Sequence, residues 1–186
     1  MNANTGSHKV TYATLSMPSD ELHTRYEAAL ERMQTRLGQT HPMHIDGQPV
    51  TAAETFAVHS PIDTGCLLGQ FQEGTAQHAH DALSAARRAF PAWSARPWQE
   101  RVEVVRRAAG LIEERLYELS ALTSLEVGKN RLEAIGDVQE AADLIYYYCD
   151  QMEANQGFDR LLLRESANVT NRSVLRPYGV WVVISH

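Results

Sequence analysis

The sequence has 186 residues, of which 44% are hydrophobic and 22% are charged, a balance typical of a globular protein. Its 17 basic and 23 acidic side chains give a formal net charge of −6, which disfavours nucleic acid as a partner because the overall field repels phosphate. No apolar run approaches the ~18 residues of a membrane-spanning helix, so we expect no membrane partner either.

The N-terminal segment and the cysteines indicate a location. Residues 1–17 are polar and show no periodic pattern, and they lack the apolar core of a signal peptide, so we expect a loose N-terminal arm. Two cysteines, Cys66 and Cys149, lack the CxxC spacing of a metal or redox site and form no disulfide framework. We therefore expect the protein in the reducing cytoplasm.

The first regular elements follow this arm. Apolar residues recur at helical spacing over residues 19–37, with Ser19 placed to cap the helix and Gly38 just after its last turn. Within residues 43–50, the Asp46-Gly47 pair stands between apolar flanks, which is the strongest short signal of a β-hairpin. The chain is therefore expected to begin with an amphipathic helix and a small hairpin.

Strands and then helices follow in the middle of the chain. Alternating residues predict strands near 56–58 and 67–71, joined by the Pro/Gly turn at 60–65. The apolar period then becomes helical. It predicts three helices: one from Thr75 until Pro91 ends it, a second after Pro97 that ends near Gly128, and a third over about 131–155.

The last part of the chain changes period again. Residues 161–163 form a short apolar run, residues 173–176 have an extended pattern, and residues 180–184 form a continuous apolar run rich in β-branched side chains, expected as a strand to Ser185. Such a run is typical of a strand buried on both faces of a parallel sheet. One strand makes no sheet, so its partners must come from sequence outside this chain or from another chain. We therefore expect an incomplete fold.

Several strings in this order resemble the aldehyde dehydrogenase superfamily from Met43 to the C-terminus. They are SPIDTG at 60–65, AFPAW at 89–93, LEVGKNRLEAIGDVQEAADLIYYY at 125–148 and RPYGVWVVIS at 176–185. The leading helix at 19–37, together with the EVGKN and YYYCDQME segments, looks most like the 1-pyrroline-5-carboxylate dehydrogenases. Members of that family oxidise glutamate γ-semialdehyde to glutamate in proline and arginine catabolism.

The resemblance implies an α/β fold: the N-terminal part of the aldehyde dehydrogenase fold. That part comprises a small β-hairpin with oligomerisation strands, three helices and the first strand of a parallel nucleotide-binding sheet. The implied segments are the arm at 1–17, the helix, hairpin and helical part of the nucleotide-binding domain at 18–158, oligomerisation-type strands at 159–179, and the first cofactor-sheet strand at 180–186. The resemblance further implies an aldehyde substrate, NAD as cofactor with NADP possible, and a homo-oligomer.

Chemistry in this family needs a Cys thiolate that attacks the aldehyde, so that hydride can pass to the nicotinamide. Neither Cys66 nor Cys149 lies in the family's nucleophile motif, so both are interpreted as structural, and no residue is assigned a catalytic role. Ile184 and Ser185 are the only cofactor-binding candidates, because the carboxyl end of a first sheet strand borders the cofactor cleft. His186 stands where the family usually has Pro.

Other motifs have ordinary structural interpretations. The histidines lack a third ligand, so no metal site is expected, and the consecutive tyrosines at 146–148 favour packing over ligand stacking. The function expected is therefore an N-terminal fragment of an NAD-dependent aldehyde dehydrogenase that is inactive alone. The alternative is a non-enzymatic assembly module that adds residues 160–184 as strands to a partner.

Overall fold

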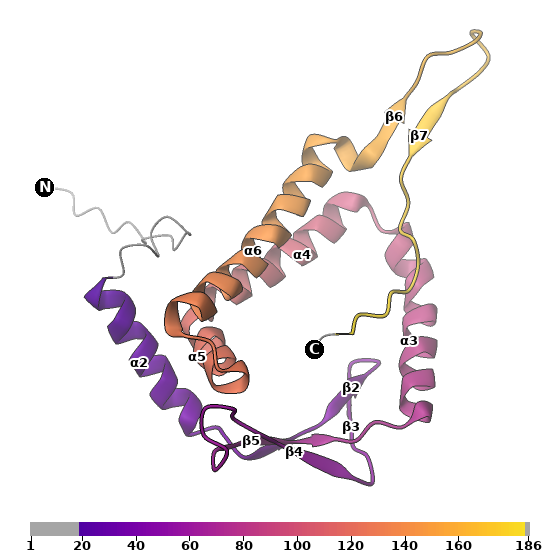
Figure 1. Cartoon of the computed structure of the whole chain (residues 1–186). Helices are drawn as coiled ribbons and strands as arrows, with labels where there is room; N and C mark the ends of the chain where they lie inside the picture. The colour runs from indigo at the N-terminus through magenta and orange to yellow at the C-terminus, as the bar shows by residue number, and fades with distance from the viewer. Residues whose placement is uncertain (1–18, 185–186) are drawn as a thin grey trace, which may run out of the picture. The chain divides into compact units, whose positions relative to one another are not determined.

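The computed structural model describes residues 19–184 (Figure 1), so the arm expected at 1–17 lies outside the described residues. The elements in chain order are α2 (Asp20–Gln34), β1 (Gln39–His41), β2 (Met43–Ile45), β3 (Gln48–Val50), β4 (Thr55–His59), β5 (Leu67–Gln72), α3 (Ala76–Ala95), α4 (Trp98–Glu114), α5 (Leu116–Val127), α6 (Arg131–Ala154), η1 (Gln156–Phe158), β6 (Asp159–Leu161) and β7 (Arg172–Val174).

The chain divides into two compact units, which alternate along the sequence. Among the described residues, unit 1 comprises 19–38, 59–68 and 109–144, and unit 2 comprises 39–58, 69–108 and 145–184. Unit 1 therefore contains α2, α5 and most of α6, whereas unit 2 contains most of the short strands, α3 and the β6–β7 hairpin.

Helix α2 forms where the sequence predicted a helix. The Oγ atom of Ser19 accepts a hydrogen bond from the backbone N–H of Leu22 at 3.2 Å, and acidic residues in the first turn favour the helix dipole. The buried face carries residues three or four positions apart: Leu22, Tyr26, Ala29 and Met33. This stripe is the amphipathic face that the periodicity predicted, although the helix ends at Gln34.

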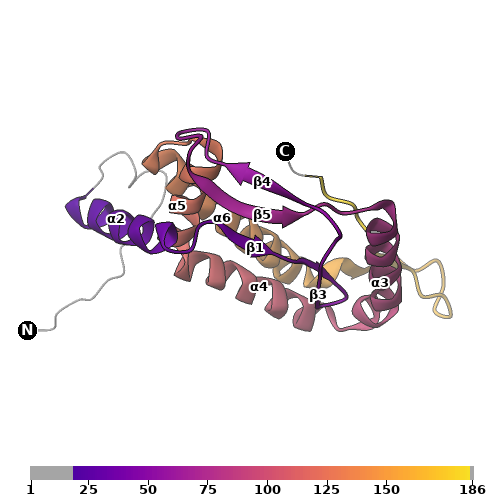
Figure 2. The ribbon, with the colours of Figure 1, turned by 90° about the horizontal axis from the view of Figure 1, so that it is seen from below.

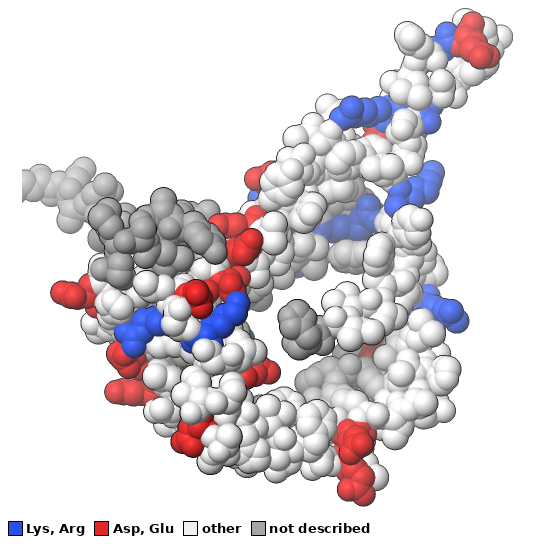
Figure 3. All heavy atoms as spheres, viewed as in Figure 1, with Lys and Arg blue, Asp and Glu red and all other residues white. Residues whose placement is uncertain are grey.

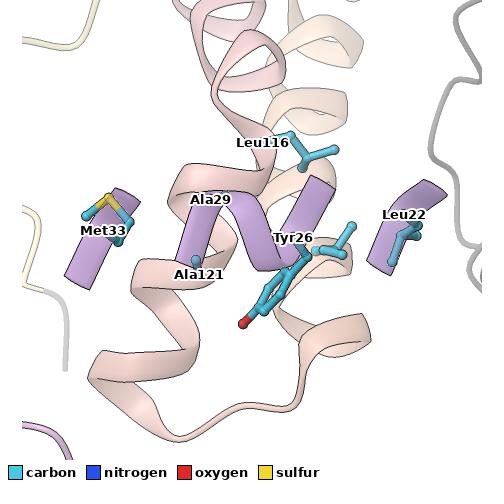
Figure 4. Packing of buried hydrophobic residues seen from close by; sticks show 7 residues of the cluster. Leu22, Tyr26, Ala29, Met33, Leu116 and Ala121 are labelled. Carbon is cyan, nitrogen blue, oxygen red and sulfur yellow. The ribbon is translucent and has the colours of Figure 1, made fainter. Parts of the chain in front are cut away.

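The core of unit 1 joins α2 to α5 and α6, as Figure 4 shows for the α2 face. Ala29, Ala121 and Ile135 are each 0% exposed, and the two alanines allow close packing of the backbones. The Tyr26 hydroxyl is buried with them and donates a hydrogen bond to Oγ of Ser124 at 2.6 Å. That bond satisfies a polar group that would otherwise be costly to bury.

Arg131 connects the start of α6 to α2. Its guanidinium lies 4.5 Å from the centre of the Tyr26 ring, a cation–π geometry, and Nη1 lies 2.8 Å from Nδ1 of His23. Nη2 forms an ion pair with Glu27. One side chain thus contacts three residues on consecutive turns of α2.

The second predicted helix is two helices in the structure. α4 ends at Glu114 and α5 begins at Leu116, because Arg115 leaves the helical region with φ −104° and ψ 17°. The break comes directly before Leu116, which is buried in the core of unit 1. α5 ends as predicted at Gly128, whose φ of 73° is left-handed and whose N–H bonds the Ser124 carbonyl at 3.0 Å.

The predicted helix end at Pro91 is wrong, since α3 continues to Ala95. A proline inside a helix removes one backbone hydrogen bond, to the carbonyl four residues earlier. Here both Pro91 and Arg87 are exposed, so water reaches the unpaired carbonyl, and Ser94 donates to the Pro91 carbonyl at 3.1 Å. Thr75 and His78 form a capping box at the other end of the helix.

The hairpin prediction is confirmed. β2 and β3 pair antiparallel with Met43 opposite Val50, and Asp46 and Gly47 take φ values of 55° and 72°. Positive φ at both central residues is the geometry of a type I′ turn. The strands before and after this hairpin in the sequence form a three-stranded sheet of order β1-β5-β4, which is visible in Figure 2. In that sheet β1 pairs parallel to β5, with Gln39 opposite Gly69.

The end of the chain holds one hairpin and one unpaired segment. β6 pairs antiparallel to β7, with Asp159 opposite Val174. The strand expected over 180–185 does not form among the described residues, where 180–184 pair with no strand and Val183 and Ile184 are each 89% exposed. None of the described strands pairs with this segment, so no ladder forms there.

The core of unit 1 generates a stability prediction. We expect Ile135→Ala to lower the free energy of unfolding by about 2–5 kcal/mol, because the side chain is fully buried and the cavity would fill poorly. The matched control on the same helix is Leu144→Ala, 49% exposed, with an expected change below about 1 kcal/mol. Urea unfolding followed by circular dichroism measures both, and equal losses would contradict the packing described.

Candidate functional site

An apolar cavity of about 420 Å³ lies within unit 2. Its walls come from the end of α3, the first half of α4, the end of α6, η1 and the segment after β7. The lining residues are Trp93, Trp98, Arg101, Val102, Val105, Tyr148, Cys149, Met152, Gly157, Phe158, Leu175, Arg176 and Pro177. Its size and its mainly apolar wall are those of small-molecule sites.

Gly157 sets the geometry of one wall. Its φ of 72° lies in the left-handed region, and a Cβ there would come closer than 3.0 Å to the indole ring of Trp98. The backbone of η1 therefore packs directly on that ring. The next wall segment is fixed by a hydrogen bond from the N–H of Leu175 to the carbonyl of Phe158 at 3.0 Å.

The charges around the cavity have one sign. Arg101 and Arg176 line it, no carboxylate does, and neither guanidinium has an ion pair or hydrogen-bonding partner among residues 19–184. On the same helix as Arg101, Arg106 is engaged by Asp150 and Glu153, and its hydrogen bond to Asp150 is the main cause of its raised pKa. The cavity therefore has free positive charge at its wall.

Cys149 belongs to the same cavity. It is 3% exposed, and Sγ lies 3.8 Å from the Val102 carbonyl oxygen. Burial raises the pKa of its thiol, which disfavours the thiolate that a nucleophile needs. Cys66, in unit 1, is half-buried. Its backbone N–H donates a hydrogen bond to the Asp63 carbonyl, and its carbonyl accepts one from the Ser60 N–H. Both cysteines thus have structural surroundings.

Two of the strings singled out in the sequence meet in unit 1. The buried Oγ of Ser60 donates a hydrogen bond to the Leu125 carbonyl at 2.5 Å. A Cβ placed on Gly128 would lie 3.6 Å from Cγ of Pro61, so the proline packs against the glycine. The first residues of SPIDTG therefore support the end of α5 and carry no visible chemistry.

Other residues singled out by the sequence have local roles. His78 accepts a hydrogen bond from the Thr75 N–H at 3.0 Å, and His41 stacks on Phe71 with ring centres 5.1 Å apart. In the described range 19–184, no three His, Cys, Asp or Glu residues gather as a metal site. Tyr148 lines the cavity and contacts Tyr147 edge to face, with ring centres 5.4 Å apart.

The two cofactor candidates do not join this cavity. Ile184 is almost fully exposed and does not line it, and Ser185 lies outside the described residues. Sequence reasoning missed the cavity because its walls are far apart in the chain. The available signal was the pair of tryptophans on either side of Pro97, where one helix ends and the next begins.

A smaller hollow of about 270 Å³ lies in unit 1, between α2 and the start of α5. Glu118 lines it and accepts hydrogen bonds from Arg115 at 2.9 Å and Arg36 at 2.6 Å. The bond from Arg115 is the main reason that the pKa of Glu118 is lowered. This ion-pair cluster connects the end of the α2 region to the start of α5.

The model of the aldehyde dehydrogenase family matches residues 49–186. The 1-pyrroline-5-carboxylate dehydrogenase of Staphylococcus haemolyticus is 34% identical over 160 residues, covering 86% of this chain and 31% of that protein. The 1-pyrroline-5-carboxylate dehydrogenase 2 of Bacillus subtilis is 33% identical over 159 residues, covering 86% and 30%. The chain spans about a third of the length of these curated relatives.

Solved structures give the same likeness. A 1-pyrroline-5-carboxylate dehydrogenase from Thermus with bound NAD has a TM-score of 0.75 and 29% identity, over 82% of this chain and 29% of that one. A point mutant of the Thermus thermophilus enzyme has a TM-score of 0.72 and 31% identity, over 76% of this chain and 27% of that one.

The contact between Gly157 and Trp98 is testable by substitution. We expect Gly157→Ala to lower the free energy of unfolding by about 1–2 kcal/mol because of the left-handed φ, and by about 1–3 kcal/mol more because Cβ would overlap the indole ring of Trp98. Gly47→Ala is the matched control, since Gly47 has the same φ of 72° with nothing within 4 Å of its Cβ position. Thermal unfolding measures both. An equal loss in the two variants would show that the ring does not pack on Gly157.

The Glu118 cluster gives a pH dependence. The pKa of Glu118 is lower in the folded than in the unfolded state. The ionised carboxylate therefore stabilises the fold above the ordinary carboxyl pKa, and this stabilisation is lost as the pH falls through the lowered pKa. Glu118→Gln should therefore be less stable than the original at pH 7, by at most about 1 kcal/mol because the pair is partly exposed, and equal to it in strong acid. Denaturant unfolding at several pH values measures this, with Glu114→Gln as the control, since Glu114 has no ion pair among residues 19–184. A pH-independent difference contradicts the ion-pair explanation.

Proposed function

The chain belongs to the aldehyde dehydrogenase family, and we propose that the whole protein oxidises glutamate γ-semialdehyde to glutamate with NAD, in proline or arginine catabolism. The fold prediction is confirmed: the chain has the N-terminal part of this family's α/β fold. The observation that carries the proposed substrate is the group of 1-pyrroline-5-carboxylate dehydrogenases that align with most of this chain, in sequence and in structure.

The proposed cofactor rests on the Thermus relative with bound NAD, with NADP as the alternative. NAD supplies the hydride acceptor for aldehyde oxidation. We propose that the described residues bind NAD poorly by themselves, because the only parallel pairing among residues 19–184 is the short β1–β5 ladder and no Gly-rich loop there leads from a strand into a helix. We keep Ile184 and Ser185 as proposed cofactor neighbours and assign no other residue of this chain to NAD.

We propose that these 186 residues alone do not catalyse the reaction. The chemistry requires an activated thiolate, and burial raises the pKa of the Cys149 thiol, which disfavours the thiolate, while Cys66 lies in a turn stabilised through its backbone. Their role in the whole protein is then to support the catalytic parts. The helical core of unit 1 and the turn at 60–65 would provide rigid packing, and no residue of this chain acts on the aldehyde.

The proposed partners are further copies of the same protein. Residues 159–179 are the proposed oligomerisation strands, and their hairpin exposes Leu161, Leu163 and Leu175 at 66%, 93% and 66%. The proposed location is the cytoplasm. No helix among residues 19–184 combines the length and apolar character that crossing a membrane would require.

A second candidate function is assembly without catalysis. It is favoured by the unpaired apolar segment at 180–184, where Trp181, Val182 and Val183 are 73%, 78% and 89% exposed. A segment of this kind can add a strand to the sheet edge of a partner. Size-exclusion chromatography with light scattering tests this candidate, because a well-behaved monomer counts against assembly, whereas a defined oligomer is compatible with both candidates.

The proposed reaction is tested at two levels. The product of the complete coding region is expected to reduce NAD when glutamate γ-semialdehyde is added, with lower kcat/KM for acetaldehyde or benzaldehyde. Absence of turnover with the semialdehyde, or preference for another aldehyde, contradicts the substrate. The purified 186-residue chain, assayed in parallel, should show no turnover above the blank, and measurable NADH formation would overturn its assignment as non-catalytic.

A further inference from the structure

We propose that the apolar cavity of unit 2 binds an amphipathic carboxylate, a small molecule with an apolar body and one terminal carboxylate. The inference does not depend on the proposed reaction, whose semialdehyde and amino-acid product are polar. It rests on two features of the cavity wall that occur together: large apolar side chains that remain partly exposed, and guanidinium groups without a counter-ion among residues 19–184.

The apolar body would lie against aromatic and aliphatic side chains. Trp98, Met152 and Phe158 line the cavity as half-buried residues, while Trp93 and Val105 remain 37% and 39% exposed. Water in contact with such a wall is displaced favourably by an apolar ligand. The volume of about 420 Å³ falls in the range of cavities that enclose small molecules.

The carboxylate would be held by Arg101 and Arg176. A guanidinium matches a carboxylate with two parallel N–H donors, and an apolar surrounding strengthens the attraction between the charges. Arg106, further along α4 than Arg101, shows the contrast, because Asp150 and Glu153 already satisfy it. Figure 3 shows basic side chains where α6 meets the β6–β7 hairpin, in the same unit.

The sign of the charge selects among ligand classes. A cation of the same shape would be repelled by the two arginines, with no carboxylate in the wall to receive it. A neutral ligand would gain the apolar contacts but leave both guanidinium groups unpaired. The wall is also held in place before any ligand arrives, by the packing of η1 on Trp98 and by the bond from Leu175 to Phe158.

The binding experiment uses the 186-residue chain and tryptophan fluorescence. Trp93 and Trp98 line the cavity, and the third tryptophan is replaced by Trp181→Phe to remove its background. Decanoate, decan-1-ol and decyltrimethylammonium are titrated below their micelle concentrations. Decanoate is expected to change the fluorescence saturably, with a Kd roughly tenfold or more below that of the alcohol, and the cation should not bind. Equal affinity for acid and alcohol, or no saturable change with decanoate, overturns the proposal.

Three variants assign the head-group site. Arg101→Met and Arg176→Met keep the aliphatic stem and should each weaken decanoate binding several-fold, while binding of the alcohol stays unchanged. Arg107→Met is the matched control, because Arg107 lies on α4, is exposed and does not line the cavity. Should Arg101→Met fail to fold by circular dichroism, the exposed Arg176→Met carries the test. The proposal is contradicted if Arg107→Met weakens decanoate binding as much as the two cavity variants do. It is also contradicted if Arg176→Met does not weaken decanoate binding.

Discussion

The described part of unit 1 depends on the close packing of α2 against α5 and α6. Ala29 and Ala121 have no side chain beyond Cβ, so the helix backbones approach closely and Ile135 fills the space that remains. The Tyr26 hydroxyl can enter this interior only because Ser124 accepts its hydrogen bond, and Arg131 then lies over the outer face of the same ring. One aromatic side chain therefore joins the apolar core to the charged surface of α2.

Local sequence signals predicted the elements whose causes are local. The cap at Ser19, the Asp46-Gly47 turn and the left-handed end at Gly128 each depend on a few adjacent residues, and all were found where expected. The break at Arg115 was missed because no glycine or proline marks it, and the core contact of Leu116 is not visible in the sequence. β1 was missed because its residues are polar and its pairing with β5 is distant in sequence.

The candidate site could not be predicted for a related reason. Each lining residue has an ordinary local interpretation, whether as an amphipathic helix position or a loop residue, and only the fold brings them together. Whether an arginine has a counter-ion also depends on the three-dimensional arrangement of the helices. Arg101 and Arg106 look alike in the sequence, yet only Arg106 forms ion pairs with acidic side chains on α6. The family strings were informative about ancestry, whereas Ser60, Pro61 and Gly128 within them proved to be packing residues.

The position of the unit 1 core along the sequence has a consequence for synthesis. The last buried residue of that core is Ile135, whereas the exposed apolar segment at 180–184 is translated later. Because domains fold as they emerge from the ribosome, N-terminal parts first, this core can close before that segment appears. The nascent polypeptide would then present an exposed apolar run from an already folded base, which is the situation that chaperones at the ribosome exit recognise and shield.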